Sequence, residues 1–217
     1  MNETFDIKTL EQSSEAIDNP FELFNDWFEL AKTSELNDPN AMTLATCKQN
    51  ALPSARIVLL KEHDERGFVF YTNTQSRKAG EIDQNMNAAL IFYWKSLNRQ
   101  IRIEGAIEKV SDEQADNYYQ SRHKGSQVGA WASKQSQTLE SRTELSDRVD
   151  SYMKEYEDVS PIPRPPHWGG FRVIPNYIEF WHDGEHRLHT RLVYERDKNA
   201  ENSQNANSVW KKRMLYP

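Results

Sequence analysis

The sequence predicts a mainly β protein with flanking helices, built on an antiparallel sheet or barrel. Two observations lead to this prediction. Five short runs rich in Val, Ile, Leu, Phe and Tyr fall within about seventy residues, and polar or glycine-containing turns such as residues 62–67 join them. The chain has 217 residues, of which 37% are hydrophobic and 11% aromatic. That is enough apolar material for the core of one large domain.

The amino-terminal part of the chain is strongly acidic. Residues 1–18 are polar and weakly periodic, and we interpret them as a flexible acidic arm that precedes a single domain over residues 19–217. Residues 1–40 contain ten acids and two lysines, a net charge of −8, whereas the whole chain carries −6. Residues 41–217 therefore carry +2, so the body of the protein could bind anions although the chain is acidic.

The first regular element is predicted to be an amphipathic helix of about four turns. Asn19 is a suitable N-cap, and Pro20 takes the first helical position, where its missing N–H costs nothing. Apolar residues then recur at helical spacing: Phe21, Phe24, Trp27, Phe28 and Ala31.

The strands follow this helix. They are expected at residues 41–47, 54–61, 67–72, 88–94 and 100–110. A short helix interrupts them, opening at Ser76 and running through Arg77 and Lys78.

The second half of the chain is predicted to alternate between helices and strands. Ser111 with Gln114 resembles a capping box and predicts a helix over residues 114–121. Residues 140–156 form a second, largely solvated helix, and the proline-rich residues 161–166 impose an extended path. Further strands are expected at residues 170–174, 177–181, 187–194 and 209–214, the last of them beyond a polar hairpin loop.

Several functional classes lack their signatures. The chain has no GxGxxG turn, Walker A loop, HExxH or GxSxG motif, and its histidines show no usual zinc spacing, so no metal site is expected. Cys47 is the only cysteine, which fits a reducing cytoplasm. The longest uncharged apolar run, residues 88–94, is too short to span a bilayer. We therefore expect neither membrane nor nucleic-acid partners.

Basic residues within apolar strands are the main candidates for ligand binding. Arg56 and Lys61 flank one apolar run, and buried cations are usually paired or bind an anion. The alternative is that both side chains reach surface carboxylates. Positions five apart on a regular strand face opposite sides, so a shared ligand requires a strand end or bend.

Three further groups suggest anion binding. Ser76, Arg77 and Lys78 combine a helix start with two cations, although a solvated helix start is equally consistent. Strand alternation would place Arg187, His189 and Arg191 on one face, which a wet barrel exterior could also hold.

The third group surrounds the end of the capped helix. Tyr118 is expected to stack on Arg122 at i, i+4, and Ser126 to follow in a glycine-containing loop. Hydroxyl and guanidinium groups suit a phosphate, but a surface cation–aromatic pair is the simpler interpretation.

Together and in this order, these pieces resemble the pyridoxine (pyridoxamine) 5′-phosphate oxidase family. The similarity runs from about residue 21 to residue 217. The matching segments are RIVLLK at 56–61, FYTN at 70–73, SRKA at 76–79, RQI at 99–101, SQVGAW at 126–131, SKQS at 133–136, PRPPHWGGFR at 163–172, IEFW at 178–181 and EHRLH at 185–189.

The resemblance implies an antiparallel split β-barrel of Greek-key type, paired as a homodimer with two FMN sites at the subunit interface. The FMN contacts that it implies are Arg56, Ile57, Val58, Leu59, Leu60, Lys61, Tyr71, Thr72, Arg77, Lys78, Gln100, Gln135, Ser136, Trp181 and Arg191. The implied contacts of the substrate are Lys61, Tyr118, Arg122 and Ser126 at its 5′-phosphate, and Arg187, Leu188 and His189 at its ring, with Arg187 and His189 as catalytic residues.

The implied reaction converts pyridoxine 5′-phosphate or pyridoxamine 5′-phosphate to pyridoxal 5′-phosphate. Hydride passes from C4′ to flavin N5, and O2 is reduced to H2O2. For the alcohol this yields the aldehyde directly; for the amine it yields an imine, which water converts to the aldehyde and ammonia. Two features depart from the family. The amino-terminal arm lacks the usual Arg-Arg-Glu-Tyr stretch, and the loop at residues 197–208 is longer than typical.

Two alternatives remain open at this stage. One is a related split-barrel flavin oxidase that acts on another ring, as in phenazine biosynthesis. Lys61, Arg122, Ser126 and residues 185–189 disfavour it, since they suit a phosphorylated pyridine. The other is a non-catalytic dimer that binds flavin or phosphate, which composition does not exclude.

Overall fold

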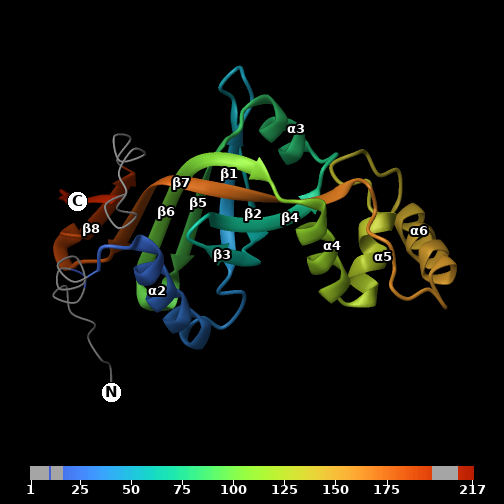
Figure 1. Cartoon of the computed structure of the whole chain (residues 1–217), viewed down its shortest axis with the longest axis horizontal. Coiled ribbons are helices and arrows are strands. Elements are labelled where there is room, and N and C mark those ends of the chain that lie inside the picture. Colours follow the sequence, from blue (N-terminus) through green and yellow to red (C-terminus); the bar gives the residue numbers. More distant parts are fainter. Residues whose placement is uncertain (1–9, 11–16, 197–209) are drawn as a thin grey trace.

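The computed structural model describes Leu10, residues 17–196 and residues 210–217. Within these residues, nine strands form one antiparallel sheet in the order β2-β1-β5-β6-β7-β4-β3, with β8 on β7 and β9 on β8. The sheet curls into a half-barrel with helices around it (Figure 1). The strands are β1 (Ala41–Cys47), β2 (Pro53–Leu59), β3 (Glu62–Asp64), β4 (Gly67–Asn73), β5 (Asn87–Trp94), β6 (Arg99–Lys109), β7 (Trp168–His182), β8 (Thr190–Arg196) and β9 (Trp210–Leu215).

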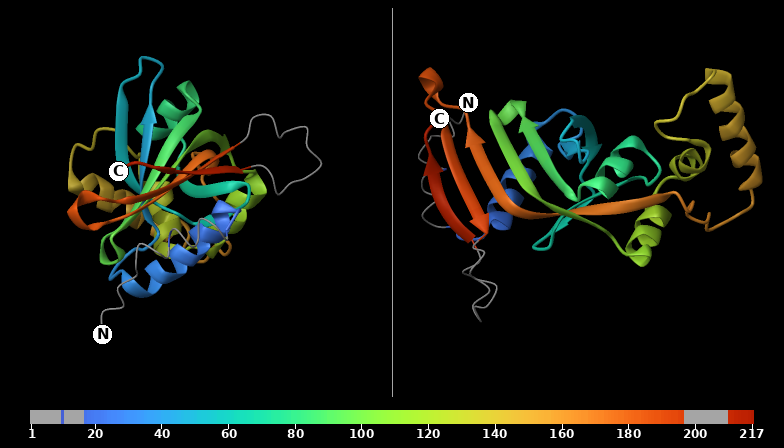
Figure 2. Two further views of the ribbon diagram at one scale, coloured as in Figure 1. Left: turned by 90° about the vertical axis from the view of Figure 1, so that its left-hand side faces the viewer. Right: turned by 90° about the horizontal axis from the view of Figure 1, so that it is seen from above.

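The helices flank the sheet, and three of them gather at one end of the molecule (Figure 1). They are α2 (Pro20–Ser34), α3 (Arg77–Gln84), α4 (Asp112–Ser121), α5 (Lys124–Ala132) and α6 (Arg142–Glu155), with single 3-10 turns η1 (Lys95–Leu97) and η2 (Glu185–Arg187). Figure 2 shows α4, α5 and α6 together at one end of the molecule, and β8 and β9 at the other. The long strand β7 connects these two ends.

Helix α2 closes the main core, as predicted. The Asn19 side chain accepts a hydrogen bond from the Phe21 amide, and Pro20 opens the helix. All five of its predicted apolar residues are buried. Phe24 is fully buried and packs edge-on against Phe68 and Phe92, with ring centroids 4.9 Å and 5.4 Å away. The 3.6-residue apolar period was therefore a reliable signal.

The first five predicted strands are confirmed with small shifts at their ends, and the short strand β3 was missed. Two strands that we expected separately, at residues 170–174 and 177–181, are one continuous strand, β7. Pro175 lies inside β7 at a register shift of its partner β6, between Glu104 and Gly105. Gly105 permits this close approach, because a Cβ there would lie 1.9 Å from the Ile174 carbonyl oxygen. The bulge accommodates Pro175 within β7, whereas the sequence suggested that this proline separates two strands.

The predicted strand at residues 187–194 is wrong in its first part. Arg187 ends the 3-10 turn η2, and the strand β8 begins only at Thr190. His186 and Arg187 have positive φ angles of 55° and 65°, in the left-handed region. The chain turns sharply here to bring β8 antiparallel to β7. Arg187, His189 and Arg191 therefore do not share a strand face by alternation.

A second, smaller core joins the helices α4 and α5 to the start of β7. Its buried residues are Tyr119, Val128, Tyr156, Ile162 and Trp168. The loop expected around Ser126 is instead the helix α5, and the ring of its N-cap His123 accepts a hydrogen bond from the Gly125 amide. The helices predicted at residues 114–121 and 140–156 are confirmed as α4 and α6, and their N-caps are Ser111 and Ser141.

The acidic arm falls largely outside the described residues, as do the loop at residues 197–208 and Val209 of the last predicted strand. Three of the arm's residues are described. Leu10 is buried in the main core, the Ile17 carbonyl accepts a hydrogen bond from the Tyr194 hydroxyl, and Asp18 pairs with Lys212 at 2.7 Å. In the described part of the chain, we find no helix with the length and apolar character that crossing a bilayer requires.

Candidate active site

A cavity of about 860 Å³ opens between β2, β4, the start of α3 and the helices α4 and α5. Fourteen of the residues that the sequence singled out line it: Arg56, Ile57, Val58, Leu59, Lys61, Tyr71, Thr72, Arg77, Lys78, Tyr118, Arg122, Ser126, Gln135 and Ser136. Its wall combines an apolar strip with several cations. These residues come from positions far apart in the sequence, so the fold assembles them.

The end of β2 explains how Arg56 and Lys61 reach the same cavity. The strand ends at Leu59, and Leu60 turns into the main core, where it is 3% exposed. The Lys61 amide then bonds to the Val69 carbonyl, which starts the path into β3. Because β2 ends between Arg56 and Lys61, both side chains can reach one ligand, as the sequence analysis required. Leu60 therefore lies behind the cavity wall and not on it.

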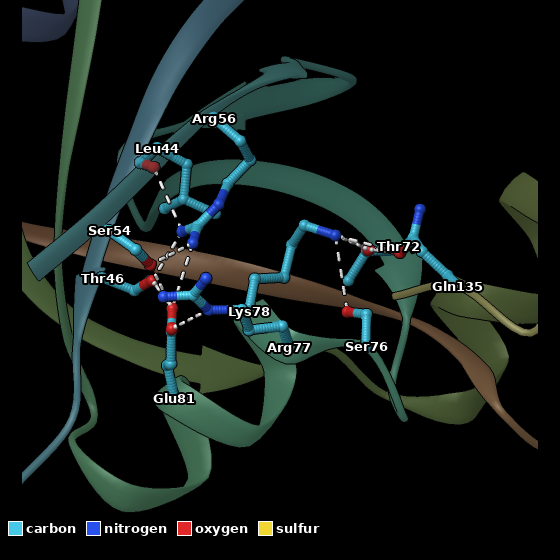
Figure 3. A network of polar contacts seen from close by, with 10 residues as sticks. All are labelled: Leu44, Thr46, Ser54, Arg56, Thr72, Ser76, Arg77, Lys78, Glu81 and Gln135. Atoms are coloured by element: carbon cyan, nitrogen blue, oxygen red, sulfur yellow. Dashed lines mark hydrogen bonds and ion pairs between the residues drawn. The ribbon is translucent and has the colours of Figure 1, made fainter. Parts of the chain in front are cut away.

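The wall beside α3 is organised around a buried carboxylate, Glu81, that the sequence analysis missed (Figure 3). Its side chain is 1% exposed. Oε2 accepts hydrogen bonds from Thr46 and Ser54, both at 2.6 Å, and from Arg56 at 3.0 Å. Oε1 accepts from Nε of Arg77 at 2.9 Å.

Burial alone would raise the pKa of Glu81. The hydrogen bonds from Ser54, Thr46, Arg77 and Arg56 outweigh this effect and lower the pKa to about 2. The carboxylate is therefore ionised at neutral pH. Arg56 is paired inside the protein and not with a surface acid, contrary to the alternative considered above.

Lys78 forms the next part of the same wall. Its Nζ donates to Gln135 Oε1 at 2.9 Å and to Thr72 Oγ1 at 3.1 Å. Burial lowers the pKa of Lys78, and the positive charge of Arg56 lowers it further, while Glu81 partly offsets both. The N-cap of α3 is Ser76, as predicted, but its side chain makes no capping bond. An anion at this helix start would meet two cations and the positive end of the helix dipole.

A stack of three aromatic rings forms the opposite wall. The Tyr71 ring lies 4.2 Å from Tyr118 and 5.1 Å from Trp168, which are 6.1 Å from each other, and the three rings are nearly parallel. The Tyr71 hydroxyl donates to Glu62 at 2.6 Å. Burial and then this bond to Glu62 raise the pKa of Tyr71 far above its ordinary value, so the phenol stays protonated.

Arg122 packs on this stack in a different way from the one predicted. Its guanidinium lies 5.0 Å from the Trp168 ring and 5.9 Å from the Tyr119 ring, whereas Tyr118 stacks on Tyr71. Arg122 ends α4 as its C-cap, so the helical i, i+4 geometry does not extend to it. Its Nη1 atom is buried without a hydrogen-bond partner among the described residues, and burial lowers the pKa of Arg122. Such a group requires a ligand or water.

The other predicted site residues lie at the far end of β7. They are Gln100, Trp181, Arg187, Leu188, His189 and Arg191, and they do not line the cavity. Trp168 and Trp181 mark the two ends, up to about 40 Å apart at roughly 3.3 Å per strand residue.

These distant residues form a cluster of their own. Trp181 is paired in register with Gln100 and with Arg191. The His189 ring lies 4.7 Å from Trp181, and Arg191 donates to the buried Glu179 at 2.8 Å. One chain thus carries two separate groups of the predicted residues.

Four lining residues had not been singled out as site residues: Ser54, Ala55, His123 and Trp168. Trp168 lies in the PRPPHWGGFR segment quoted above, and Ser54 and Ala55 belong to β2, the strand of Arg56. Glu81 had one local signal, because it follows Arg77 at the i, i+4 spacing of a helical ion pair.

Comparison with known proteins gives consistent matches along the chain. Residues 30–153 match the family described as "Pyridoxamine 5'-phosphate oxidase", and residues 168–217 match the "Pyridoxine 5'-phosphate oxidase C-terminal dimerisation region". A protein of Azorhizobium caulinodans named pyridoxine/pyridoxamine 5'-phosphate oxidase is 52% identical over 93% of this chain and 92% of its own length. One of the same name from Bartonella quintana is 54% identical over 91% and 92%.

Solved structures show the same fold. PhzG from Burkholderia lata, in complex with tetrahydrophenazine-1-carboxylic acid, has a TM-score of 0.85 and 30% identity, and the match covers 94% of this chain and 96% of that one. A pyridoxamine 5'-phosphate oxidase-related, FMN-binding protein from Nostoc punctiforme has a TM-score of 0.70 at 17% identity, over 91% and 97% of the two chains. The second match supports the split-barrel fold alone.

Proposed function

Since the chain belongs to the pyridoxine/pyridoxamine 5′-phosphate oxidase family, we propose that it is an FMN-dependent oxidase that forms pyridoxal 5′-phosphate from pyridoxine or pyridoxamine 5′-phosphate. The observation that carries the proposal is the arrangement of cations on one cavity. Arg56, Arg77 and Lys78 gather on one wall, and Lys61 and Arg122 line the same space. Two groups of cations suit two phosphorylated ligands.

The cavity fits FMN by size and chemistry. Its volume of about 860 Å³ is within the usual range for cofactor sites. Arg77 and Lys78, at the start of α3, would hold the FMN phosphate together with Arg56. The residues Ile57, Val58 and Leu59 of β2 would offer backbone groups and apolar surface to the ring system. Tyr71, Thr72, Gln135 and Ser136 would complete the contacts on this chain.

The substrate would lie against the aromatic stack. Arg122 has a buried, unpartnered Nη1, and this is the strongest single indication of an anionic group nearby. With Lys61, Tyr118 and Ser126, it would hold the 5′-phosphate. Two phosphates held on one cavity would fix the substrate against the flavin, and this alignment is the protein's main contribution to catalysis.

The chemistry that FMN would supply here is acceptance of a hydride from C4′ of the substrate, with O2 as the final oxidant and H2O2 as its product; for the amine, water would then convert the imine to the aldehyde and ammonia. The protein's own groups would bind and orient. The Tyr71 phenol stays protonated, and the half-buried carboxylate Glu62 and the buried carboxylate Glu81 are engaged in hydrogen bonds. We therefore assign none of these three as a general base.

The complete site would require two copies of the chain. Gln100, Trp181, Arg187, Leu188, His189 and Arg191 would reach the FMN and substrate of the partner subunit. The match of residues 168–217 to a dimerisation region supports this arrangement. Exposed apolar side chains occur near both groups: Ile57 and Leu59 on β2, and Leu188 and Met214 near the distant cluster. A homodimer would bury such surface.

The sheet runs through both matched segments, which supports one domain over residues 19–217. We also propose a cytoplasmic location, on the ground that Cys47 is the only cysteine.

The alternatives are less well supported. The compound bound to PhzG is named as a carboxylic acid, and the cations Lys61 and Arg122 suit a phosphate better than a ring with one carboxylate. A non-catalytic flavin dimer would not need Arg187 and His189 at the distant cluster. One experiment separates the proposed oxidase from both alternatives, because neither alternative predicts reduction of the flavin by pyridoxamine 5′-phosphate.

The test is to mix the FMN-loaded protein with pyridoxamine 5′-phosphate in the absence of oxygen. We expect the yellow flavin absorbance to bleach, and air to restore it with one H2O2 per flavin. Pyridoxamine without the phosphate is the control and should bleach the flavin far more slowly. Flavin that stays yellow with both phosphorylated substrates would rule out the oxidase.

A further inference from the structure

The charged residues around α3 include one acid whose role the proposed FMN contacts do not explain. Glu81 is an acid on the wall where the FMN phosphate is proposed to bind, and it is almost fully buried. An acid beside a phosphate opposes binding by direct repulsion. Its hydrogen bonds go to the cations on that wall, Arg56 and Arg77, and to Thr46 and Ser54 from the neighbouring strands.

We infer that Glu81 is a positioning residue for phosphate recognition: it holds the guanidinium groups of Arg56 and Arg77 in place and adjusts the charge of the wall to that of a phosphate monoester. This inference rests on the proposed binding of FMN in the cavity. Glu81 itself would not touch the phosphate.

The first argument is geometric. The two oxygens of Glu81 are divided between the two arginines, Oε2 to Arg56 and Oε1 to Arg77. Arg77 bonds to Glu81 through Nε, and within the described residues its two terminal nitrogens donate no hydrogen bond, so they remain for an anion. The Arg77 side chain is 60% exposed, and a long exposed side chain has many rotamers. The bond to a buried, fixed carboxylate restricts them before the ligand arrives.

The second argument concerns charge. Arg56 and Arg77 both bond to Glu81, and Lys78 bonds separately to Thr72 and Gln135 beside them (Figure 3). The three cations carry three positive charges on one wall, and Glu81 reduces the sum to two. A phosphate monoester carries about −1.5 to −2 near neutral pH. With Glu81 ionised, the net positive charge of the wall therefore equals the negative charge of a phosphate dianion and does not exceed it. Glu81 also favours the charged form of Lys78, whose pKa burial and Arg56 lower.

A purely structural role is the competing explanation. Through Thr46 and Ser54, Glu81 also ties α3 to β1 and β2, and this tie alone could account for its burial. The two roles differ in what they predict for a ligand without a phosphate. A positioning role affects FMN and spares riboflavin, whereas a structural role weakens both or only lowers stability.

The experiment titrates the apoprotein with FMN and with riboflavin, following flavin fluorescence, in the wild type and in Glu81→Gln. We expect Glu81→Gln to weaken FMN binding about tenfold or more, the effect of losing one charge-assisted hydrogen bond, with riboflavin unchanged within twofold. Asp83→Asn is the matched control. It removes one negative charge from the same helix at an exposed position and should leave FMN binding unchanged.

A double-variant cycle tests whether Glu81 acts through Arg77. In the Arg77→Ala background, Glu81→Gln should weaken FMN binding by a smaller factor than in the wild type. Glu81→Asp keeps the charge and should bind FMN better than Glu81→Gln. If the circular dichroism spectrum shows that Glu81→Gln does not fold, Ser54→Ala takes its place, since it removes one donor to Glu81 and one contact of Arg56.

The outcomes separate this inference from the proposed function. A wild-type protein that binds FMN no better than riboflavin would refute the FMN site itself. A wild type that prefers FMN, with equal FMN affinity in Glu81→Gln, would refute only the positioning role. Equal losses for FMN and riboflavin would assign Glu81 to structure.

Discussion

Gly170 lies directly opposite Tyr71 in the register of β4 and β7, and a Cβ at Gly170 would come within 2.6 Å of Tyr71 Cε1. No real side chain tolerates that distance, so the position of the Tyr71 ring depends on the missing Cβ. Tyr71 packs against both other rings of the stack, Tyr118 and Trp168. A backbone feature of β7 thus shapes the wall where we propose the substrate to bind.

We therefore expect Gly170→Ala to displace Tyr71. The overlap should cost about 1–3 kcal/mol of unfolding free energy, as overpacking usually does, and should raise KM for pyridoxamine 5′-phosphate. Chemical denaturation and steady-state kinetics measure the two effects. Gly80→Ala on α3 is the control, because a Cβ there meets no atom within 4 Å, and it should be neutral or stabilising. Equal stability of the two variants would contradict the close approach.

Arg122→Ala should separate substrate binding from FMN binding. We assign the buried Nη1 of Arg122 to the 5′-phosphate of the substrate. Its loss should lower kcat/KM for pyridoxamine 5′-phosphate roughly ten- to hundredfold, the usual range for a hydrogen bond to a charged group. FMN affinity should stay within twofold. The same kcat/KM in the variant and the wild type would show that Arg122 has only a packing role on Trp168.

His63 should make stability depend on pH. Its ring packs between Phe24, Phe28 and Phe68, and its Nε2 lies 2.7 Å from Asn25 Oδ1. Burial, and then the nearby Lys32, lowers the pKa of His63, although Asp64 and Glu29 partly offset this. The unfolded chain binds the proton near pH 6.5, before the folded protein does.

The contribution of His63 to stability is thus complete above pH 6.5, and it is lost as the pH falls through the lowered folded value. Denaturation at pH 7.5 and 5.5 should show a smaller decrease in stability for His63→Phe than for the wild type. A decrease of the same size in both proteins would assign the pH dependence to other groups. His182, whose pKa burial also lowers, is one such group.

Local signals in the sequence predicted the elements, but not the long-range contacts. The N-cap and apolar period of α2 and the alternation of β1 lie within single segments, and the structure has them where the pattern indicated. Helix α5 was missed because Gly125 and Gly129 lower helix propensity and a histidine is an unusual cap. The predicted start of β8 was wrong because the alternating residues Arg187, His189 and Arg191 mimic a strand, although the chain turns at His186 and Arg187.

The candidate site shows the same division. The cations Arg56, Arg77 and Lys78 were found from the patterns of their own segments, and the resemblance to a family then assigned them to FMN. Glu81 was not, because its partners Thr46, Ser54 and Arg56 lie 35, 27 and 25 residues away. A buried ion pair becomes evident only when the fold brings both sides together. The separation of Arg187 and His189 from the cavity likewise follows from the sheet order and not from the pattern.

The last prediction tests whether the site is shared between two subunits. Arg187→Ala should slow turnover far more than it weakens FMN binding, because we assign Arg187 to the substrate ring on the partner subunit. Arg122→Ala should also impair turnover, through the other half of the site. A dimer made of one variant alone carries the same defect in both of its sites. If Arg122 and Arg187 serve one site from opposite subunits, a mixed dimer has one site with both defects and one site with neither.

Unfolding and refolding the two variants together should therefore restore activity to about a quarter of the wild-type level, since half of the dimers are mixed and each has one intact site. The control refolds each variant alone, which should give no recovery. Mixing that restores nothing, although mixed dimers form, would mean that Arg122 and Arg187 act within the same subunit. We do not expect that outcome, because within one subunit the two groups lie at opposite ends of β7, up to about 40 Å apart, and one small ligand could not touch both.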